Sequence, residues 1–219
     1  RQAIYRQVGA YEASKLEAHF ATLGFMNAKG GEMTVVHPAT VCGHSRTGHI
    51  ADGQPLVDLI RNLVQGKLAA VPGTAAHWLP LVTVDYLVEL VAACAFDPSM
   101  AGQELLALDA QSPGLQELLT QVAQPLGLKA PGHHIPLRLL KWLLGIRPIA
   151  RFLNTSAEAL DFIQTTRFDT TEVGQFAQRH GITKPDMRQS LRNTAIYVNS
   201  YCIPKGKARR LAPPLRRTS

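Results

Sequence analysis

The chain has 219 residues, of which 46% are hydrophobic and 18% charged, a composition typical of a globular protein with one core and at most a small second lobe. It has no apolar run of the roughly 18 residues that a membrane-spanning helix needs. The odd set of three distant cysteines, Cys42, Cys94 and Cys202, predicts reduced thiols in a cytoplasmic protein rather than a disulfide framework.

The net charge of +7 is concentrated at one end of the chain. Residues 205–219 hold six of the 23 Lys and Arg residues and no acid, which leaves 17 basic against 16 acidic residues elsewhere. An almost neutral body does not favour a nucleic-acid partner. The segment 205–219 is predicted to be a basic disordered tail, with contact to an acidic partner or anionic lipid as the less favoured alternative.

In the first quarter of the chain, residues 8–23 are expected to form a helix that ends at Gly24. The β-branched run 33–41 predicts a strand that ends near Pro38. Residues 43–55 are rich in Gly, Ser, Thr and His without periodicity, so we expect a long loop there.

Further along, 56–67 is predicted to be a helix, and 77–97 to begin extended and turn helical from about Val84. A strand is expected at 103–110, a helix at 112–128, and helices and loops over 133–203. This alternation favours an α/β domain with a parallel sheet. Two strands do not make a self-sufficient parallel sheet, so we expect its N-terminal strands to lie outside these residues.

Residues 11–15 read YEASK and place Tyr11 and Lys15 one helical turn apart on the same face. A tyrosine with an ordinary pKa near 10 is a poor proton donor or acceptor at neutral pH. A neighbouring ammonium lowers that pKa, and it keeps N–H donors for sugar hydroxyls. Alone, this spacing is common in helices, and the polar side of an ordinary helix is then the better interpretation.

The segments that follow in order change this interpretation, because together they resemble the C-terminal half of an extended short-chain dehydrogenase/reductase. Within that family they are most similar to the branch of thioester reductases and fatty-acyl reductases. The resemblance covers residues 8 to about 110, and His37 stands where the family usually has arginine. The matching positions are Tyr11, Lys15, His37, Pro38, Gly43, His44, Ser45, Thr47, Gly48, Pro80, Val84, Asp85 and Tyr86.

The resemblance implies roles for particular residues. Tyr11 would be the catalytic acid that protonates the carbonyl oxygen, and Lys15 would bind the nicotinamide ribose and lower the pKa of Tyr11. The backbone around Pro38, Ala39, Thr40 and Val41 would face the nicotinamide of NADP(H) or NAD(H). Ser45, Arg46 and Thr47 would form a substrate loop that contacts cofactor phosphate or substrate, with self-bonding of the loop weighed as equal.

Two parts of the family pattern do not occur in the sequence. The glycine-rich phosphate loop is missing, and the upstream Ser or Thr that polarises the substrate carbonyl would precede Arg1. We therefore expect a fragment: residues 1–128 as the C-terminal part of a Rossmann-like doubly wound domain, 129–204 as a helical substrate-binding or lid region, and 205–219 as the tail. These residues alone are expected not to bind the dinucleotide, because its phosphates have no loop to bind to.

Other candidate features are interpreted conservatively. The histidines and Cys42 lack the spacing of a zinc site, so no metal is predicted. Asp85, at the start of a helix, is expected to act as a helix cap. Residues 135–153 are apolar with interspersed Arg and Lys, and a packed helix or a lid over an acyl chain is favoured over a membrane-surface helix.

The predicted function is an NAD(P)H-dependent oxidoreductase that reduces an acyl thioester on coenzyme A or a carrier domain. Two alternatives stay open. One is a nucleotide-sugar epimerase or dehydratase, which shares the Tyr/Lys pair, and the other is a cofactor-sensing protein that keeps the fold without turnover.

Overall fold

The computed structural model describes residues 2–148 and 158–204, which divide into two compact units. Unit 1 comprises Arg1–His37 and Val91–Leu105, and unit 2 comprises Pro38–Leu90 and Leu106–Ser219. The described residues form helices and parallel strands, which confirms the predicted α/β class. The proposed domain boundaries at 128 and 204 stay a prediction, and the tail 205–219 lies outside the described residues.

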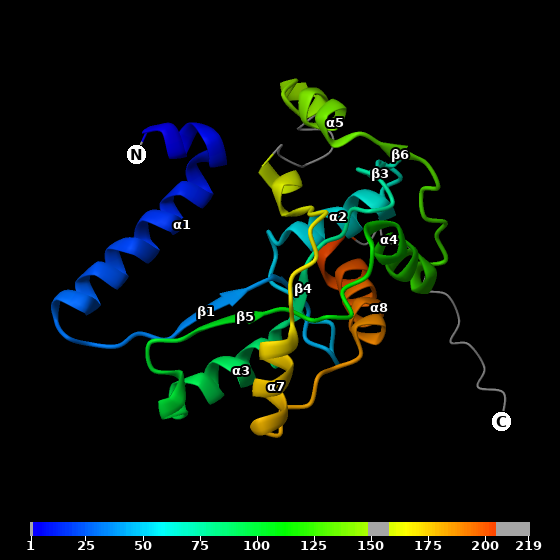
Figure 1. The fold of residues 1–219 in the computed structure, drawn as a ribbon. Helices are drawn as coiled ribbons and strands as arrows, with labels where there is room; N and C mark the ends of the chain where they lie inside the picture. The colour runs from blue at the N-terminus through cyan, green and yellow to red at the C-terminus, as the bar shows by residue number, and fades with distance from the viewer. Residues whose placement is uncertain (1, 149–157, 205–219) are drawn as a thin grey trace, which may run out of the picture. The chain divides into compact units, whose positions relative to one another are not determined.

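Unit 1 is built around the long helix α1 (Gln2–Ala28), drawn in blue in Figure 1. The helix is longer than predicted because Gly24 lies inside it and does not end it. The chain leaves the helix at Gly30, whose φ of +67° is the left-handed conformation that glycine adopts without strain. The amide of Gly31 donates to the Met26 carbonyl at 3.0 Å and closes the helix end.

Six strands occur among the described residues, paired in three two-stranded sheets, where the sequence indicated two. The pairs are β1 (Val35–Pro38) with β5 (Glu104–Ala107), β2 (Thr40–Cys42) with β4 (Leu81–Thr83), and β3 (Val71–Pro72) with β6 (His134–Ile135). The predicted strand 33–41 is found as β1 and β2, separated at Ala39. The pairs β2–β4 and β3–β6 are parallel, as expected for an α/β fold.

The helices largely follow the apolar patterns of the sequence. They are α2 (Pro55–Val64), α3 (Val84–Phe96), α4 (Leu115–Ala123), α5 (Leu137–Leu144), α7 (Thr171–Arg179) and α8 (Met187–Tyr197), with the 3₁₀ turns η1 (Pro98–Met100), η2 (Gln124–Leu126) and η3 (Glu158–Phe162) and the π-helical turn η4 (Val198–Cys202). Helix α3 begins at Val84, where the sequence placed it. In the described part of the chain no helix is long and apolar enough to cross a membrane.

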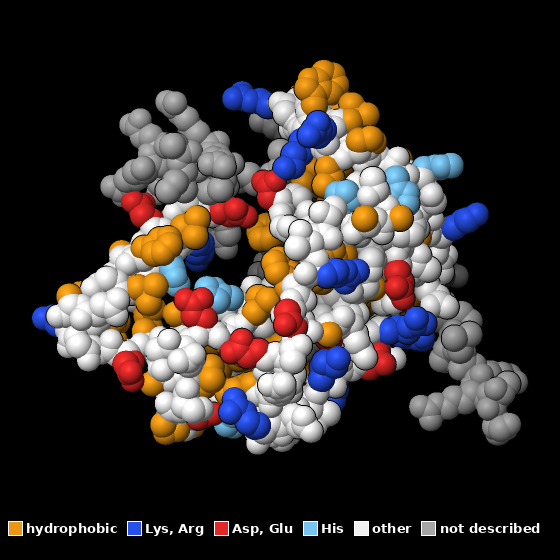
Figure 2. Space-filling view, in the orientation of Figure 1, with side chains coloured by type: hydrophobic (Ala, Val, Ile, Leu, Met, Phe, Trp, Pro, Cys, Tyr) orange, Lys and Arg blue, Asp and Glu red, His pale blue; other side chains and the backbone are white. Residues whose placement is uncertain are grey.

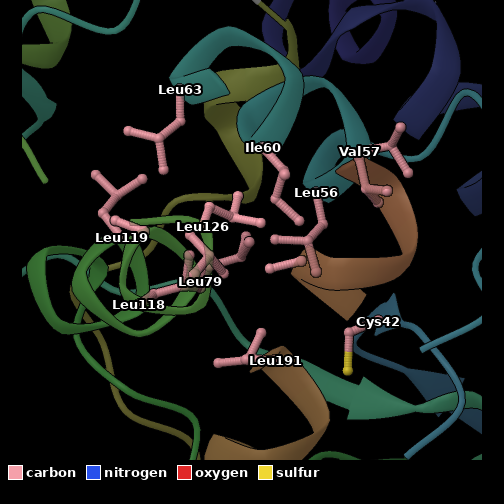
Figure 3. Packing of buried hydrophobic residues seen from close by; sticks show 14 of the residues in the cluster. Cys42, Leu56, Val57, Ile60, Leu63, Leu79, Leu118, Leu119, Leu126 and Leu191 are labelled. Atoms are coloured by element: carbon pink, nitrogen blue, oxygen red, sulfur yellow. The ribbon is translucent and has the colours of Figure 1, made fainter. Parts of the chain in front are cut away.

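The core of unit 2 lies between α2, α4 and α8 (Figure 3). Leucines from these three helices, such as Leu56, Leu118 and Leu191, are fully buried. Cys42, at the end of β2, closes one side of the cluster with 1% of its surface exposed. The core therefore fixes the end of β2, and the loop that follows β2 starts from a rigid base.

Helix α5 covers the described part of 135–153, where the sequence favours a packed helix or a lid. Leu144 is buried, but Leu139 and Trp142 are exposed, so only one side of the helix packs. Helix α5 therefore carries apolar side chains on both faces, and its role as a packed helix or a lid stays a prediction. Residues 149–153 of the predicted segment lie outside the described residues.

Candidate active site

The predicted acid and its partner lie on α1 of unit 1. Tyr11 and Lys15 are separated by one helical turn, so the two positions share a face of the helix. Lys15 is exposed, and Ala13 between them is buried. The spacing that the proton-transfer hypothesis requires is therefore present, and the assignment of roles to this pair stays a prediction.

His37, which replaces the arginine of the family pattern, also lies in unit 1. Its Nε2 is 3.0 Å from Oε2 of Glu104, and its ring centroid is 5.8 Å from that of His19. Both partners of the His37–Glu104 contact are about half exposed. The histidine thus links β1 to β5 through a polar contact, a cross-strand role that an arginine could equally fill.

The four residues expected to face the nicotinamide lie where β1 ends and β2 begins. The amide of Ala39 donates to the Ala107 carbonyl and that of Thr40 to the Pro80 carbonyl, each at 3.0 Å. Pro38 has no N–H, and alternate residues of a parallel strand direct their amides to the same neighbour. The Thr40 amide is therefore directed to the segment of β4, and the Ala39 amide to β5.

The loop after β2 closes on itself. The amide of Gly48 donates to the His44 carbonyl at 2.8 Å, and the amide of His44 donates to the His49 carbonyl at 2.9 Å. Arg46 and Thr47, at the tip, are exposed. We call residues 43–49 the substrate loop, after the role that the sequence predicts for it.

Asp85, in the first turn of α3, binds the substrate loop. Ser45 donates both its amide, at 3.0 Å, and its hydroxyl, at 2.5 Å, to the two oxygens of this carboxylate. His44 Nδ1 lies 3.9 Å from the same group. Burial raises the pKa of Asp85, but the hydrogen bonds from Ser45 outweigh it and hold that pKa below the ordinary carboxyl value. Asp85, expected to be a helix cap, therefore serves as an ionised anchor for Ser45.

Helix α8 holds the other side of the substrate loop, through residues that the sequence analysis missed. Asn193 donates to the carbonyls of Ser45, at 2.7 Å, and Arg46, at 3.1 Å. A Cβ atom on Gly48 would lie 2.1 Å from the Asn193 carbonyl oxygen, so the loop backbone packs directly on the helix backbone. Nothing local in the sequence indicates this contact, because Asn193 follows Ser45 by 148 residues.

A fully buried carboxylate, that of Asp109, follows β5 and was also missed. Asp109 is 1% exposed, accepts the Gln111 amide at 2.7 Å and lies 3.4 Å from Nζ of Lys184. Its position just after the carboxyl end of a strand is the available sequence signal, since strand carboxyl ends gather polar site residues. Within the described ranges, no group of three or more His, Cys, Asp or Glu side chains is arranged to hold a metal ion.

The chain was compared with protein-family models, curated proteins and solved structures. No family model and no curated protein matches the sequence. Three solved structures that match are the terminal R domain from the myxalamid PKS-NRPS biosynthetic pathway, RMD from Pseudomonas aeruginosa complexed with NADPH, and UDP-glucuronic acid 4-epimerase from Bacillus cereus in complex with NAD. Their sequence identities are 18%, 17% and 11%, and their TM-scores 0.61, 0.53 and 0.53.

These matches cover 82%, 87% and 90% of this chain but 46%, 56% and 53% of the matched chains, so the chain spans about half the length of the structures it resembles. At such identities the likeness concerns the fold and no finer property. The predicted α/β fold is confirmed: the chain folds like about half of each of these structures.

Proposed function

We propose that the chain is the catalytic-helix portion of an NAD(P)H-dependent oxidoreductase that reduces an acyl thioester carried by coenzyme A or a carrier domain. The observation that carries the proposal is the placement of Tyr11 and Lys15 one turn apart on α1. The ordered motifs that follow, including a substrate loop anchored to Asp85, support it.

Lys15 is exposed and has the kind of N–H donor that suits a ribose hydroxyl of a dinucleotide. When bound, the reduced nicotinamide supplies hydride. Tyr11 then gives its phenolic proton to the oxygen that gains negative charge, and the Lys15 ammonium favours the phenolate that remains.

The test is oxidation of NADPH by the full-length protein with acyl-CoA and carrier-bound acyl substrates. We expect Tyr11→Phe to lower kcat/KM by about 10²–10⁴-fold, the usual contribution of a positioned acid. Lys15→Met is expected to lower it and to weaken cofactor binding. Lys29→Met, the same change beyond the end of α1, is the matched control and should leave turnover unchanged.

A nucleotide-sugar epimerase is the second candidate, because the match to the epimerase covers 90% of this chain. The two functions differ in what happens to the cofactor. A reductase consumes NADPH in proportion to product, whereas an epimerase returns the hydride and leaves no net oxidation. Turnover of a sugar nucleotide without net oxidation would favour the epimerase, and unchanged turnover in Tyr11→Phe would refute the mechanism for both.

A further inference from the structure

The outward face of α5 is unusual for a surface helix. Leu139 and Trp142, three residues apart on the helix, share a face and are 47% and 66% exposed, and Ile146, just after the helix end, is 40% exposed. We call these three residues the α5 stripe. The opposite side of the helix includes Leu144, which is buried. The other tryptophan, Trp78, is 2% exposed, which is the usual environment for this side chain.

The surroundings of the α5 stripe are positively charged. Arg138, Lys141 and Arg147 are exposed beside it, and Lys141 forms an ion pair with Asp161 of η3. Figure 2 shows Lys and Arg side chains next to hydrophobic ones where Figure 1 places α5.

We propose that α5 is a docking surface for an anionic lipid bilayer. The α5 stripe enters the boundary between headgroups and acyl chains, where tryptophan is favoured, and Arg138 and Arg147 bind the phosphates beside it. Charge complementarity selects this occupant, since the exposed Arg138 and Arg147 flank the stripe and a lipid surface offers a continuous field of negative charge.

The length and packing of α5 determine how it would lie at the membrane surface. Helix α5 spans 8 residues, so it is too short to cross a bilayer and lies in the plane of the surface. Leu144, on the other side, stays packed against the protein, so docking needs no unfolding of unit 2. The surface is therefore a monotopic contact that is reversible and sensitive to salt.

The experiment uses the full chain with vesicles of phosphatidylcholine alone and of phosphatidylcholine mixed with phosphatidylglycerol. We expect flotation with the phosphatidylglycerol vesicles, weakened by salt, together with a blue shift of Trp142 fluorescence as the ring leaves water. Trp142→Ser should weaken binding by about tenfold or more. Phe96→Ser removes an aromatic side chain that is 88% exposed elsewhere and is the matched control, with binding unchanged.

A second variant keeps the proposal testable if Trp142→Ser alters the fold. Arg138→Gln with Arg147→Gln leaves the stripe intact and should weaken binding while flattening its dependence on salt. Equal binding to both vesicle types would overturn the proposal. So would binding that survives Trp142→Ser but is lost on deletion of 205–219, since the basic tail would then be the contact. Loss of carrier-substrate turnover in Trp142→Ser without any vesicle binding would assign the stripe to a protein partner instead.

Discussion

Replacing Gly48 by alanine tests whether the substrate loop rests on the backbone of α8. Gly48 has φ of +70°, and its added Cβ would lie 2.1 Å from the Asn193 carbonyl oxygen and 2.7 Å from the Thr194 amide nitrogen. The left-handed conformation costs an alanine about 1–2 kcal/mol. Forcing atoms into a packed contact costs roughly 1–3 kcal/mol more. We therefore expect Gly48→Ala to lower the free energy of unfolding by about 2–5 kcal/mol.

Gly53→Ala is the matched control. Gly53 has φ of +81°, but nothing lies within 4 Å of its added Cβ, so the substitution carries the conformational cost without the clash. Equilibrium unfolding in urea, followed by circular dichroism, gives both free energies. Asn193→Ala should not rescue Gly48→Ala, because the atoms met are main-chain atoms. Equal destabilisation by the two glycine substitutions would refute the close packing of the loop on α8.

Three further predictions concern the anchor, the core and the thiols. Ser45→Ala should cost about 1–3 kcal/mol at neutral pH. Folding lowers the pKa of Asp85, so the loss in the free energy of unfolding should be constant at pH values above the ordinary carboxyl pKa of 3.8. This loss should shrink as the pH falls through the lower pKa of the folded state. Urea titrations at several pH values would detect the change. Leu118→Ala should cost about 2–5 kcal/mol by leaving a cavity, whereas the exposed Leu139→Ala should lie within about 0.5 kcal/mol of wild type in the same assay. Iodoacetamide should label Cys202 first and Cys42 last, by mass spectrometry of peptides, because burial raises the pKa of Cys42 to about 12 and shields its sulfur; early labelling of Cys42 would contradict the core position of β2.

The elements that sequence reasoning placed well are those with strong local patterns. The strand-to-helix change at Val84 was predicted at the right residue, and helix 56–67 was found at 55–64. Gly24 misled the prediction for α1, since a glycine inside a helix costs only about 1 kcal/mol and the surrounding turns tolerate it. Local signals therefore fix the type of an element better than its end.

The parts that could not be predicted depend on long-range contacts. Strands β3 and β6 have two residues each, and Val71 becomes part of a strand only because it donates its amide to the His133 carbonyl at 2.7 Å. The same holds for Asn193, whose partners lie in the substrate loop. No period or spacing in the sequence encodes such pairs, because each side is ordinary until the fold brings them together.

Some residues of the substrate loop hold it in place, and others lie exposed at its tip. Only the exposed residues are available to a ligand. Ser45 uses both its amide and its hydroxyl on Asp85, so the serine of this motif holds the loop rather than presenting a free hydroxyl. Arg46 and Thr47 remain exposed beside it, and the guanidinium of an arginine suits a phosphate or carboxylate. If Ser45→Ala lowers activity, the cause would be displacement of the substrate loop, and the free energy of unfolding should fall as well. If Arg46→Gln lowers activity while the free energy of unfolding is unchanged, Arg46 contacts the ligand directly.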